Sequence, residues 1–131
     1  MAPLIYLDTH VAVWLYGGTA DLFPPAVRGL LEAEDLVVSP MVVLELQYLY
    51  EIRRTAEPAQ VVLAALSRDL DLGVCDLPFI EVARAALAQT WTRDPFDRII
   101  VGHAALRGAR LLTKDRHIRA NYSQALWSEE A

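Results

Sequence analysis

The chain has 131 residues, of which 54% are hydrophobic and 22% are charged, and its formal net charge is −5. This length fits one domain with its own core, and the composition excludes an intrinsically disordered protein. A single cysteine, Cys75, excludes an internal disulfide and a cysteine-based zinc site. No apolar run reaches the roughly 18 residues of a membrane span, and the first residues lack the basic region of a signal peptide. We therefore expect a cytoplasmic protein without a membrane partner.

Strand-like runs alternate with helix-like patterns along the whole chain. Short continuous apolar runs predict strands buried on both faces, at residues 4–7, 36–38, 71–75, 110–113 and 125–127. Helices are predicted between them, at residues 10–16, 24–32, 40–53, 58–69, 79–89, 95–108 and 116–120. This alternation indicates a single α/β domain over residues 1–131, with a mostly parallel central sheet of four to five strands and helices on both faces.

Two aspartates stand directly after predicted strands. Asp8 follows the first strand and is followed by Thr9, and Asp115 comes two residues after Thr113, which ends the strand at 110–113. Ligands of open α/β sheets bind at this carboxyl edge of the strands. The alternative is that each carboxylate only caps the helix that begins there.

Glu45 lies inside the apolar face predicted for the helix at 40–53. The spacing of one buried face is followed by Met41, Leu44, Tyr48, Leu49 and Ile52. A carboxylate on such a face loses hydration at a large cost in free energy, unless a cation or hydrogen-bond donors compensate. Glu45 is therefore a candidate ligand of a cation, and a salt bridge to a neighbouring arginine is the alternative.

The stretch from Arg93 to Arg98 places two carboxylates three residues apart at the start of a helix. Asp94 is a good N-cap, Pro95 fits the first helical position, and Asp97 stands where it can reach back to the N–H of the cap. Taken alone, Asp94 is better explained as a cap than as a ligand.

These acids come from distant segments that an α/β fold can bring to one sheet edge: Asp8, Glu45, Asp97 and Asp115, with Asp94 as a further candidate. Clustered carboxylates repel one another unless cations neutralise them, and hard oxygen ligands suit Mg²⁺ or Mn²⁺. Such a site can activate water for phosphodiester hydrolysis.

Basic residues gather in the C-terminal part of the chain. Seven of the 12 lie between residues 93 and 119. Among them, Arg98, Lys114 and Arg116 are candidates for holding an RNA backbone, although basic residues on solvated helix faces are the alternative.

Four motifs, in this order, resemble those of PIN-domain nucleases and, more narrowly, of the VapC-type toxins of bacterial toxin–antitoxin pairs. The motifs are Ile5–His10 with Trp14, Ser39-Pro40 leading to Glu45, Arg93–Arg98, and Leu111–Asp115. Each is weak alone, but the four in sequence are specific and cover essentially the whole chain. One departure is that Trp91-Thr92 stands where members of this subset often carry histidines.

The resemblance implies a set of site residues and partners. Asp8, Glu45, Asp97 and Asp115 would take the metal-site positions, and Asp94 would be the extra acid of an Asp-Pro-Phe-Asp subset. Thr9 and Thr113 would have orienting roles, with Thr113 acting on Asp115 or on a water molecule at the metal. The family further implies Mg²⁺-dependent cleavage of RNA, a homodimer, and inhibition by an antitoxin peptide laid over the active site.

Two other interpretations remain open. Asp8 could be the nucleophile of an aspartyl-phosphate phosphatase or a phosphoacceptor receiver, with Lys114 as phosphate partner, although His10 stands where the phosphatase pattern has a second aspartate. The chain could also be a non-catalytic binding module whose acids are caps and salt bridges. Of the other reactive side chains, His103 and Cys75 are expected in the core and His117 at the surface.

Overall fold

The structure of this protein is a computed structural model that describes residues 4–18 and 20–127. At its centre lies a parallel sheet with the strand order β3-β2-β1-β4-β5. The described strands are β1 (Leu4–Leu7), β2 (Asp35–Val38), β3 (Gly73–Val74), β4 (Arg110–Leu112) and β5 (Ala125–Leu126). Neighbouring strands all pair in parallel, which confirms the predicted α/β fold.

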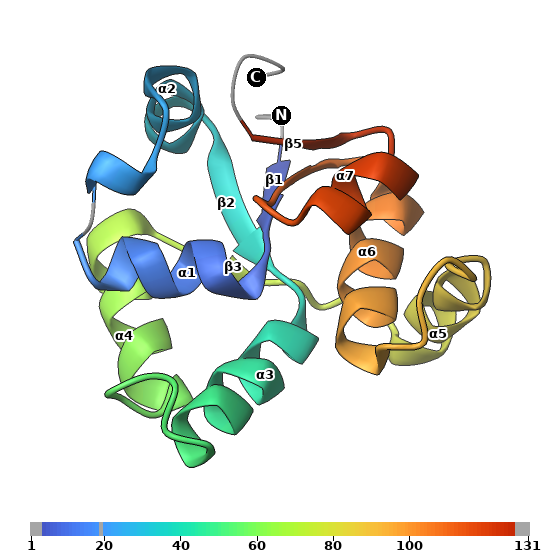
Figure 1. Cartoon of the computed structure of the whole chain (residues 1–131), viewed down its shortest axis with the longest axis horizontal. Coiled ribbons are helices and arrows are strands. Elements are labelled where there is room, and N and C mark those ends of the chain that lie inside the picture. Colours follow the sequence, from blue (N-terminus) through green and yellow to red (C-terminus); the bar gives the residue numbers. More distant parts are fainter. Residues whose placement is uncertain (1–3, 19, 128–131) are drawn as a thin grey trace.

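Helices cover both faces of this sheet, as predicted. In Figure 1, α1, α2 and α4 lie on one side of the strands and α5, α6 and α7 on the other, while α3 lies beyond their carboxyl ends. The described helices are α1 (Thr9–Tyr16), α2 (Pro25–Ala33), α3 (Pro40–Glu51), α4 (Ala59–Leu70), α5 (Phe79–Leu87), α6 (Pro95–Arg107) and α7 (Arg116–Asn121), with a 3₁₀ turn, η1 (Ala20–Leu22). No described helix has the length and apolar character needed to cross a membrane.

The strand order changes direction between β1 and β4. After β1 the strands are added on the β2 side, whereas β4 and β5 are added on the other side of β1. Leu7 of β1 pairs with Leu112 of β4, and the Asp8 N–H donates to the Leu112 carbonyl at 3.0 Å. The carboxyl ends of these strands are therefore level. Ligands of parallel sheets bind at such a switch point, which here lies between Asp8 and Thr113.

Strand β3 is shorter than the sequence predicts. It spans only Gly73–Val74, both exposed at the edge of the sheet, rather than residues 71–75. Asp71 adopts a left-handed conformation, with φ at 55°, as the residue that ends α4. Because Asp71 completes the helix, the strand can begin only after it.

The predicted buried face of α3 is wrong in part. Val42, Leu46 and Leu49 are the buried residues of this helix. The exposed fractions of three residues predicted to be buried are 58% for Leu44, 47% for Tyr48 and 44% for Ile52. Apolar residues occupy most positions of α3, so their period cannot identify the face that meets α1, α4 and α6.

Helix α6 is held at a short distance from α5. A Cβ atom added at Gly102 would lie 3.1 Å from the backbone nitrogen of Ala86, so the glycine permits this close approach. From the same helix, the Arg98 guanidinium donates to the carbonyls of Ala86 and Leu87, each at 3.2 Å, and so caps the end of α5. These contacts fix the helix that carries Asp97.

Candidate active site

Asp8 lies at the carboxyl end of β1 with both carboxylate oxygens hydrogen-bonded. Oδ1 accepts the Thr9 N–H at 2.8 Å and Oδ2 accepts the Thr113 hydroxyl at 2.6 Å. The residue is 8% exposed, and burial raises its pKa although the two hydrogen bonds oppose the rise. Because a carboxylate has about four lone-pair sites, the bonds leave acceptor capacity on each oxygen.

Glu45 is joined to the same corner by a hydroxyl, rather than by the arginine of the alternative interpretation. The Thr9 hydroxyl donates to Glu45 Oε1 at 2.5 Å, so Thr9 contacts Asp8 through its backbone and Glu45 through its side chain. Burial raises the pKa of Glu45, and the nearby charge of Asp8 raises it further. The carboxylate of α3 therefore faces the end of β1.

Asp94 and Asp115 both cap helices, as the simpler interpretation predicted. Asp94 Oδ1 accepts the N–H groups of Phe96 and Asp97, at 2.8 and 3.4 Å. Asp115 Oδ1 accepts the N–H groups of His117 and Ile118, at 2.8 and 3.1 Å. Each cap uses one carboxylate oxygen, so capping does not consume the binding capacity of either side chain.

The reciprocal bond predicted from Asp97 to the cap residue does not form. The Asp94 N–H instead donates to the Thr92 hydroxyl at 3.1 Å. Thr92 thus replaces Asp97 as the partner of this N–H, and the half-buried Asp97 carboxylate does not serve in a capping box.

Asp97 experiences the charges of the other acids. Its pKa is raised to about 7, first by burial and then by Asp94, Asp8, Asp115 and Glu45, in that order. We call these five residues the acid cluster. Their mutual repulsion is what gathered carboxylates show in the absence of a counter-ion.

The carboxylates of the acid cluster are not arranged as the ligands of one metal ion. Among the described residues, no group of three or more His, Cys, Asp or Glu side chains is arranged to hold a metal ion. The carboxylates instead take hydrogen bonds from threonine hydroxyls and helix N–H groups, which offset their repulsion. Metal ligation by the cluster therefore stays a prediction.

The predicted auxiliary residues have different environments. Thr113 donates to Asp8, and its hydroxyl also accepts the Asp115 N–H at 3.0 Å, so it contacts two members of the cluster. Lys114 and Arg116 are exposed next to Asp115, whereas Arg98 has donors engaged on α5. Binding of RNA by these three residues stays a prediction.

Sequence reasoning missed a buried bond between α3 and α6, the helices that carry Glu45 and Asp97. Ser39 Oγ lies 2.8 Å from His103 Nδ1 and also accepts the Met41 N–H at the start of α3. His103 is buried, as predicted, and burial lowers its pKa. Its type and helical position signal a core histidine, but nothing in the sequence pairs it with a residue 64 positions away.

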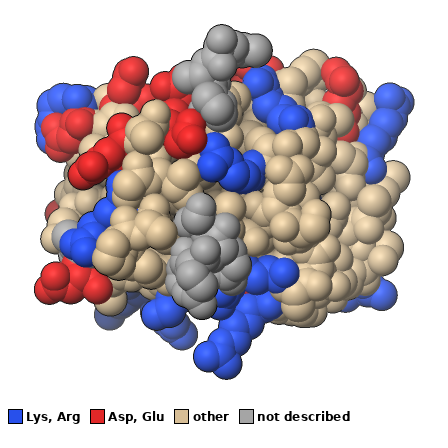
Figure 2. All heavy atoms as spheres, turned by 90° about the horizontal axis from the view of Figure 1, so that it is seen from above, with Lys and Arg blue, Asp and Glu red and all other residues tan. Residues whose placement is uncertain are grey.

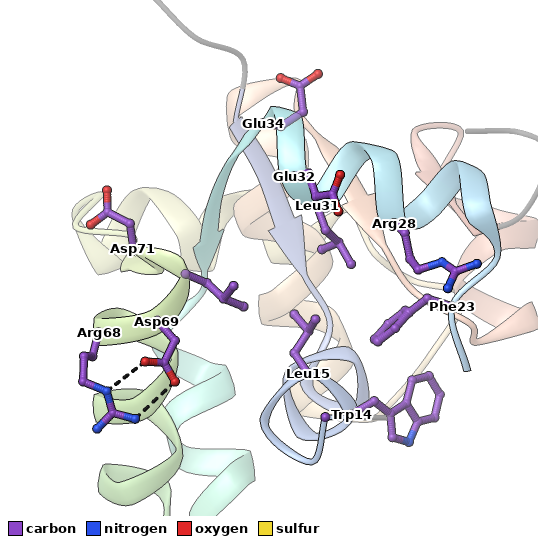
Figure 3. Close-up of a pocket in the computed structure, with 12 residues that line it drawn as sticks. Trp14, Leu15, Phe23, Arg28, Leu31, Glu32, Glu34, Arg68, Asp69 and Asp71 are labelled. Carbon is purple, nitrogen blue, oxygen red and sulfur yellow. Dashed lines mark hydrogen bonds and ion pairs between the residues drawn. The ribbon is translucent and has the colours of Figure 1, made fainter. Parts of the chain in front are cut away.

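A cavity of about 570 Å³ lies away from the acid cluster, and none of the five acids lines it. Figure 3 shows Leu15, Leu31 and Phe23 directed toward its centre, with the ion pair of Arg68 and Asp69 at one side. Figure 2 looks onto the opposite end of the molecule from α3, where acidic and basic side chains are interspersed. That face therefore offers no extended surface of one charge.

Comparison with known proteins agrees with this architecture. A PIN domain profile matches residues 5–123. Ribonuclease VapC22 of Mycobacterium tuberculosis is 32% identical over 120 residues, covering 89% of this chain and 91% of the relative. The structure of VapBC2 from Rickettsia felis, bound to a promoter DNA fragment, matches with a TM-score of 0.67 at 21% identity, over 95% of this chain and 98% of that one. VapBC-1 from nontypeable Haemophilus influenzae matches with a TM-score of 0.63 at 19% identity, over 95% and 96%. The chain therefore belongs to the PIN domain family.

Proposed function

We propose that this protein is a metal-dependent endoribonuclease and the toxin of a toxin–antitoxin pair. The observation that carries the proposal is that five acids lie near the switch point between β1 and β4, where burial, and after it the charges of the other four acids, raise the pKa of Asp97 to about 7. The relative VapC22, which is named a ribonuclease, supports RNA as the substrate.

The chain supplies ligands for a hard cation. Asp8, Glu45, Asp97 and Asp115 would hold Mg²⁺ or Mn²⁺, with Asp94 as a further candidate, because their oxygen donors suit these ions. A bound cation would neutralise charge on the phosphodiester and activate the attacking water. Thr9 and Thr113 hold Glu45 and Asp8 in place, and Lys114 and Arg116 would bind backbone phosphates.

Removal of metal should stop cleavage. We expect the purified protein to cleave single-stranded RNA in Mg²⁺, to lose this activity in excess EDTA and to regain it when Mg²⁺ is restored, measured on denaturing gels. Asp69→Asn provides a control, because Asp69 is an exposed acid outside the cluster, paired with Arg68. Undiminished cleavage in EDTA would refute the metal-dependent mechanism.

The alternative enzyme class has less support. An aspartyl-phosphate nucleophile needs an accessible carboxylate, whereas Asp8 is 8% exposed and accepts hydrogen bonds on both oxygens. The Lys114 ammonium, the proposed phosphate partner, lies 5.8 Å from the ring centroid of Trp14. A non-catalytic module would give no reason for a half-buried acid, Asp97, among four others.

The cavity shown in Figure 3 is a candidate docking site for one segment of the antitoxin, separate from the segment expected to lie over the active site, because the cavity lies away from the acid cluster. Its apolar lining includes Trp14, Leu15, Phe23 and Leu31, which suits apolar side chains of a partner peptide. The solved neighbours from Rickettsia felis and Haemophilus influenzae are VapBC proteins, which supports a partner of this kind.

A charge introduced into this cavity should leave RNA cleavage intact but prevent inhibition by the antitoxin. We expect Leu31→Asp to cleave RNA normally but to escape inhibition when it is co-expressed with the cognate antitoxin, measured as arrested growth of the host cells. Glu32→Ala, which alters a charged residue of the same lining, is the matched control and should remain inhibited. Full inhibition of Leu31→Asp would contradict this location.

We further propose a homodimer that uses the exposed apolar row that runs along α3 to its C-cap residue, Ile52. Leu44, Tyr48 and Ile52 are spaced four residues apart and lie on one outer face, each more than two-fifths exposed. A second copy would bury this row.

A charge on this row should prevent self-association. We expect the wild-type protein to have the mass of a dimer and Leu44→Glu that of a monomer, measured by size-exclusion chromatography with light scattering. Leu106→Glu is the control, because Leu106 is an exposed leucine of α6 rather than α3. A Leu44→Glu protein that remains dimeric would place the interface elsewhere.

A further inference from the structure

Two aromatic side chains meet next to the acid cluster without belonging to it. Trp91 lies in the loop before α6 and His117 in the first turn of α7, with ring centroids 4.9 Å apart and planes inclined at 79°. Trp91 comes three residues before Asp94, and the His117 N–H donates to Asp115 at 2.8 Å. The pair therefore joins the two segments that bring these acids to the cluster.

The pair is fixed in position but remains in contact with solvent. The Trp91 indole N–H donates to Gln89 Oε1 at 2.8 Å, and its ring packs partly against the core. His117 is exposed, although it contacts the indole. An aromatic ring that is already held loses little conformational freedom when a ligand binds it.

A nucleobase is a ligand whose chemistry fits this pair. Bases stack on aromatic side chains with little dependence on sequence, because every base has a π-face. The phosphates of RNA are repelled by the acid cluster and by the net charge of −5, whereas stacking does not depend on charge. The adjacent exposed Arg93 and Arg116 could hold the phosphates on either side of the stacked base.

We propose that Trp91 and His117 form a binding site for one nucleobase of a single-stranded RNA, next to the acid cluster. The inference rests on the proposed function, since it assigns part of the binding of the same substrate. A base held there would fix the position of its neighbouring phosphodiester relative to the acids, so base binding would contribute to orienting the scissile bond.

Binding to two matched strands tests this site. The probes are a fluorescein-labelled single-stranded RNA and an abasic ribose-phosphate strand of the same length, measured by fluorescence anisotropy in EDTA at low salt so that no cleavage occurs. We expect the wild type to prefer the RNA, and His117→Ala to weaken RNA binding by about tenfold while leaving abasic binding unchanged.

Three further variants test whether the aromatic rings cause the preference for RNA over the abasic strand. Trp91→Phe retains an aromatic ring and should retain most of the RNA binding, whereas Trp91→Leu should resemble His117→Ala, with folding verified by circular dichroism. His10→Ala removes the same chemical group from the other exposed histidine, whose ring lies 6.2 Å from that of Trp14, and should leave both strands unaffected.

The outcomes separate this inference from the proposed function. Equal weakening of both strands by His117→Ala, or unchanged RNA binding, would overturn the base site. If the wild type still cleaved RNA in Mg²⁺, the nuclease assignment would stand without it. A wild type that bound RNA in preference to the abasic strand but never cleaved it would support the base site and overturn the nuclease.

Discussion

Replacing Asp97 by asparagine should strongly reduce RNA cleavage and, in the absence of metal, stabilise the fold. The first effect follows because Asp97 is a predicted ligand of the catalytic cation. Loss of part of the charge stabilisation that a metal gives the transition state should lower kcat/KM roughly a hundredfold or more. The measurement is RNA cleavage in Mg²⁺, with Asp69→Asn as the control that removes an acid outside the cluster.

The second effect follows from the pKa of Asp97, which is raised from 3.8 to about 7 in the fold. A carboxyl with a raised folded-state pKa favours folding fully below pH 3.8, and that contribution is lost as the pH rises through about 7. Above pH 7 the charged side chain therefore opposes folding. An asparagine carries no charge at any of these values, so it avoids the repulsion.

Thermal melts in EDTA at pH 8 and at pH 5 distinguish this account from a simple loss of structure. At pH 8 we expect the free energy of unfolding of Asp97→Asn to be about 1 kcal/mol higher than that of the wild type. This value allows for solvent screening, because Asp97 is only half-buried. At pH 5, where Asp97 is mostly protonated, the difference should shrink. A variant that is less stable than the wild type at pH 8 would show that Asp97 has a structural role instead.

The acids at the ends of strands could be predicted from the sequence because their positions depend on local pattern. A continuous apolar run followed by Asp8, or by Thr113 and Asp115, fixes both the strand and the edge at which the acid stands. The parallel sheet follows from the alternation of elements. What this pattern cannot give is the distance between acids from different segments.

The errors concern features that depend on tertiary contacts. In α3 the apolar positions are too numerous for their period to identify the core face. The period therefore predicts that Leu44 and Tyr48 are buried, although both are exposed in the structure. For Asp97 the helix-start pattern predicted a capping box, but the loop supplies Thr92 as a competing partner. The bond of Ser39 to His103 joins residues whose proximity only the folded chain creates.

Hydrogen bonds from two threonines offset the repulsion within the cluster of acids. Thr9 contacts both Asp8 and Glu45, and Thr113 contacts both Asp8 and the Asp115 backbone. Their donated hydrogen bonds lower the pKa of Asp8 and Glu45, opposing the effect of burial. These bonds hold the carboxylates near one another without neutralising their charge, so we expect the cluster to attract a cation.

Binding of Mn²⁺ should therefore stabilise the protein, and the effect should grow with pH. A ligand that binds only the folded state raises its stability, by about 2.7 kcal/mol at a concentration of 100 times its Kd. Below pH 7 the cation must displace the proton of Asp97. Displacement of this one proton should make the apparent affinity rise by at most about tenfold for each pH unit. Above pH 7 this dependence should level off, because Asp97 is then charged in the free protein.

Thermal shifts in a Mn²⁺ titration at pH 5.5, 6.5, 7.5 and 8.5 measure this dependence. Asp97→Asn should bind Mn²⁺ more weakly at every pH and should lose the part of the slope that comes from its carboxyl group, whereas Asp69→Asn should follow the wild type. An affinity that does not change between pH 5.5 and 7.5 would show that Asp97 does not exchange its proton for the cation. Asp97 would then have to be removed from the predicted ligands, because a cation that binds its oxygens must compete with its proton.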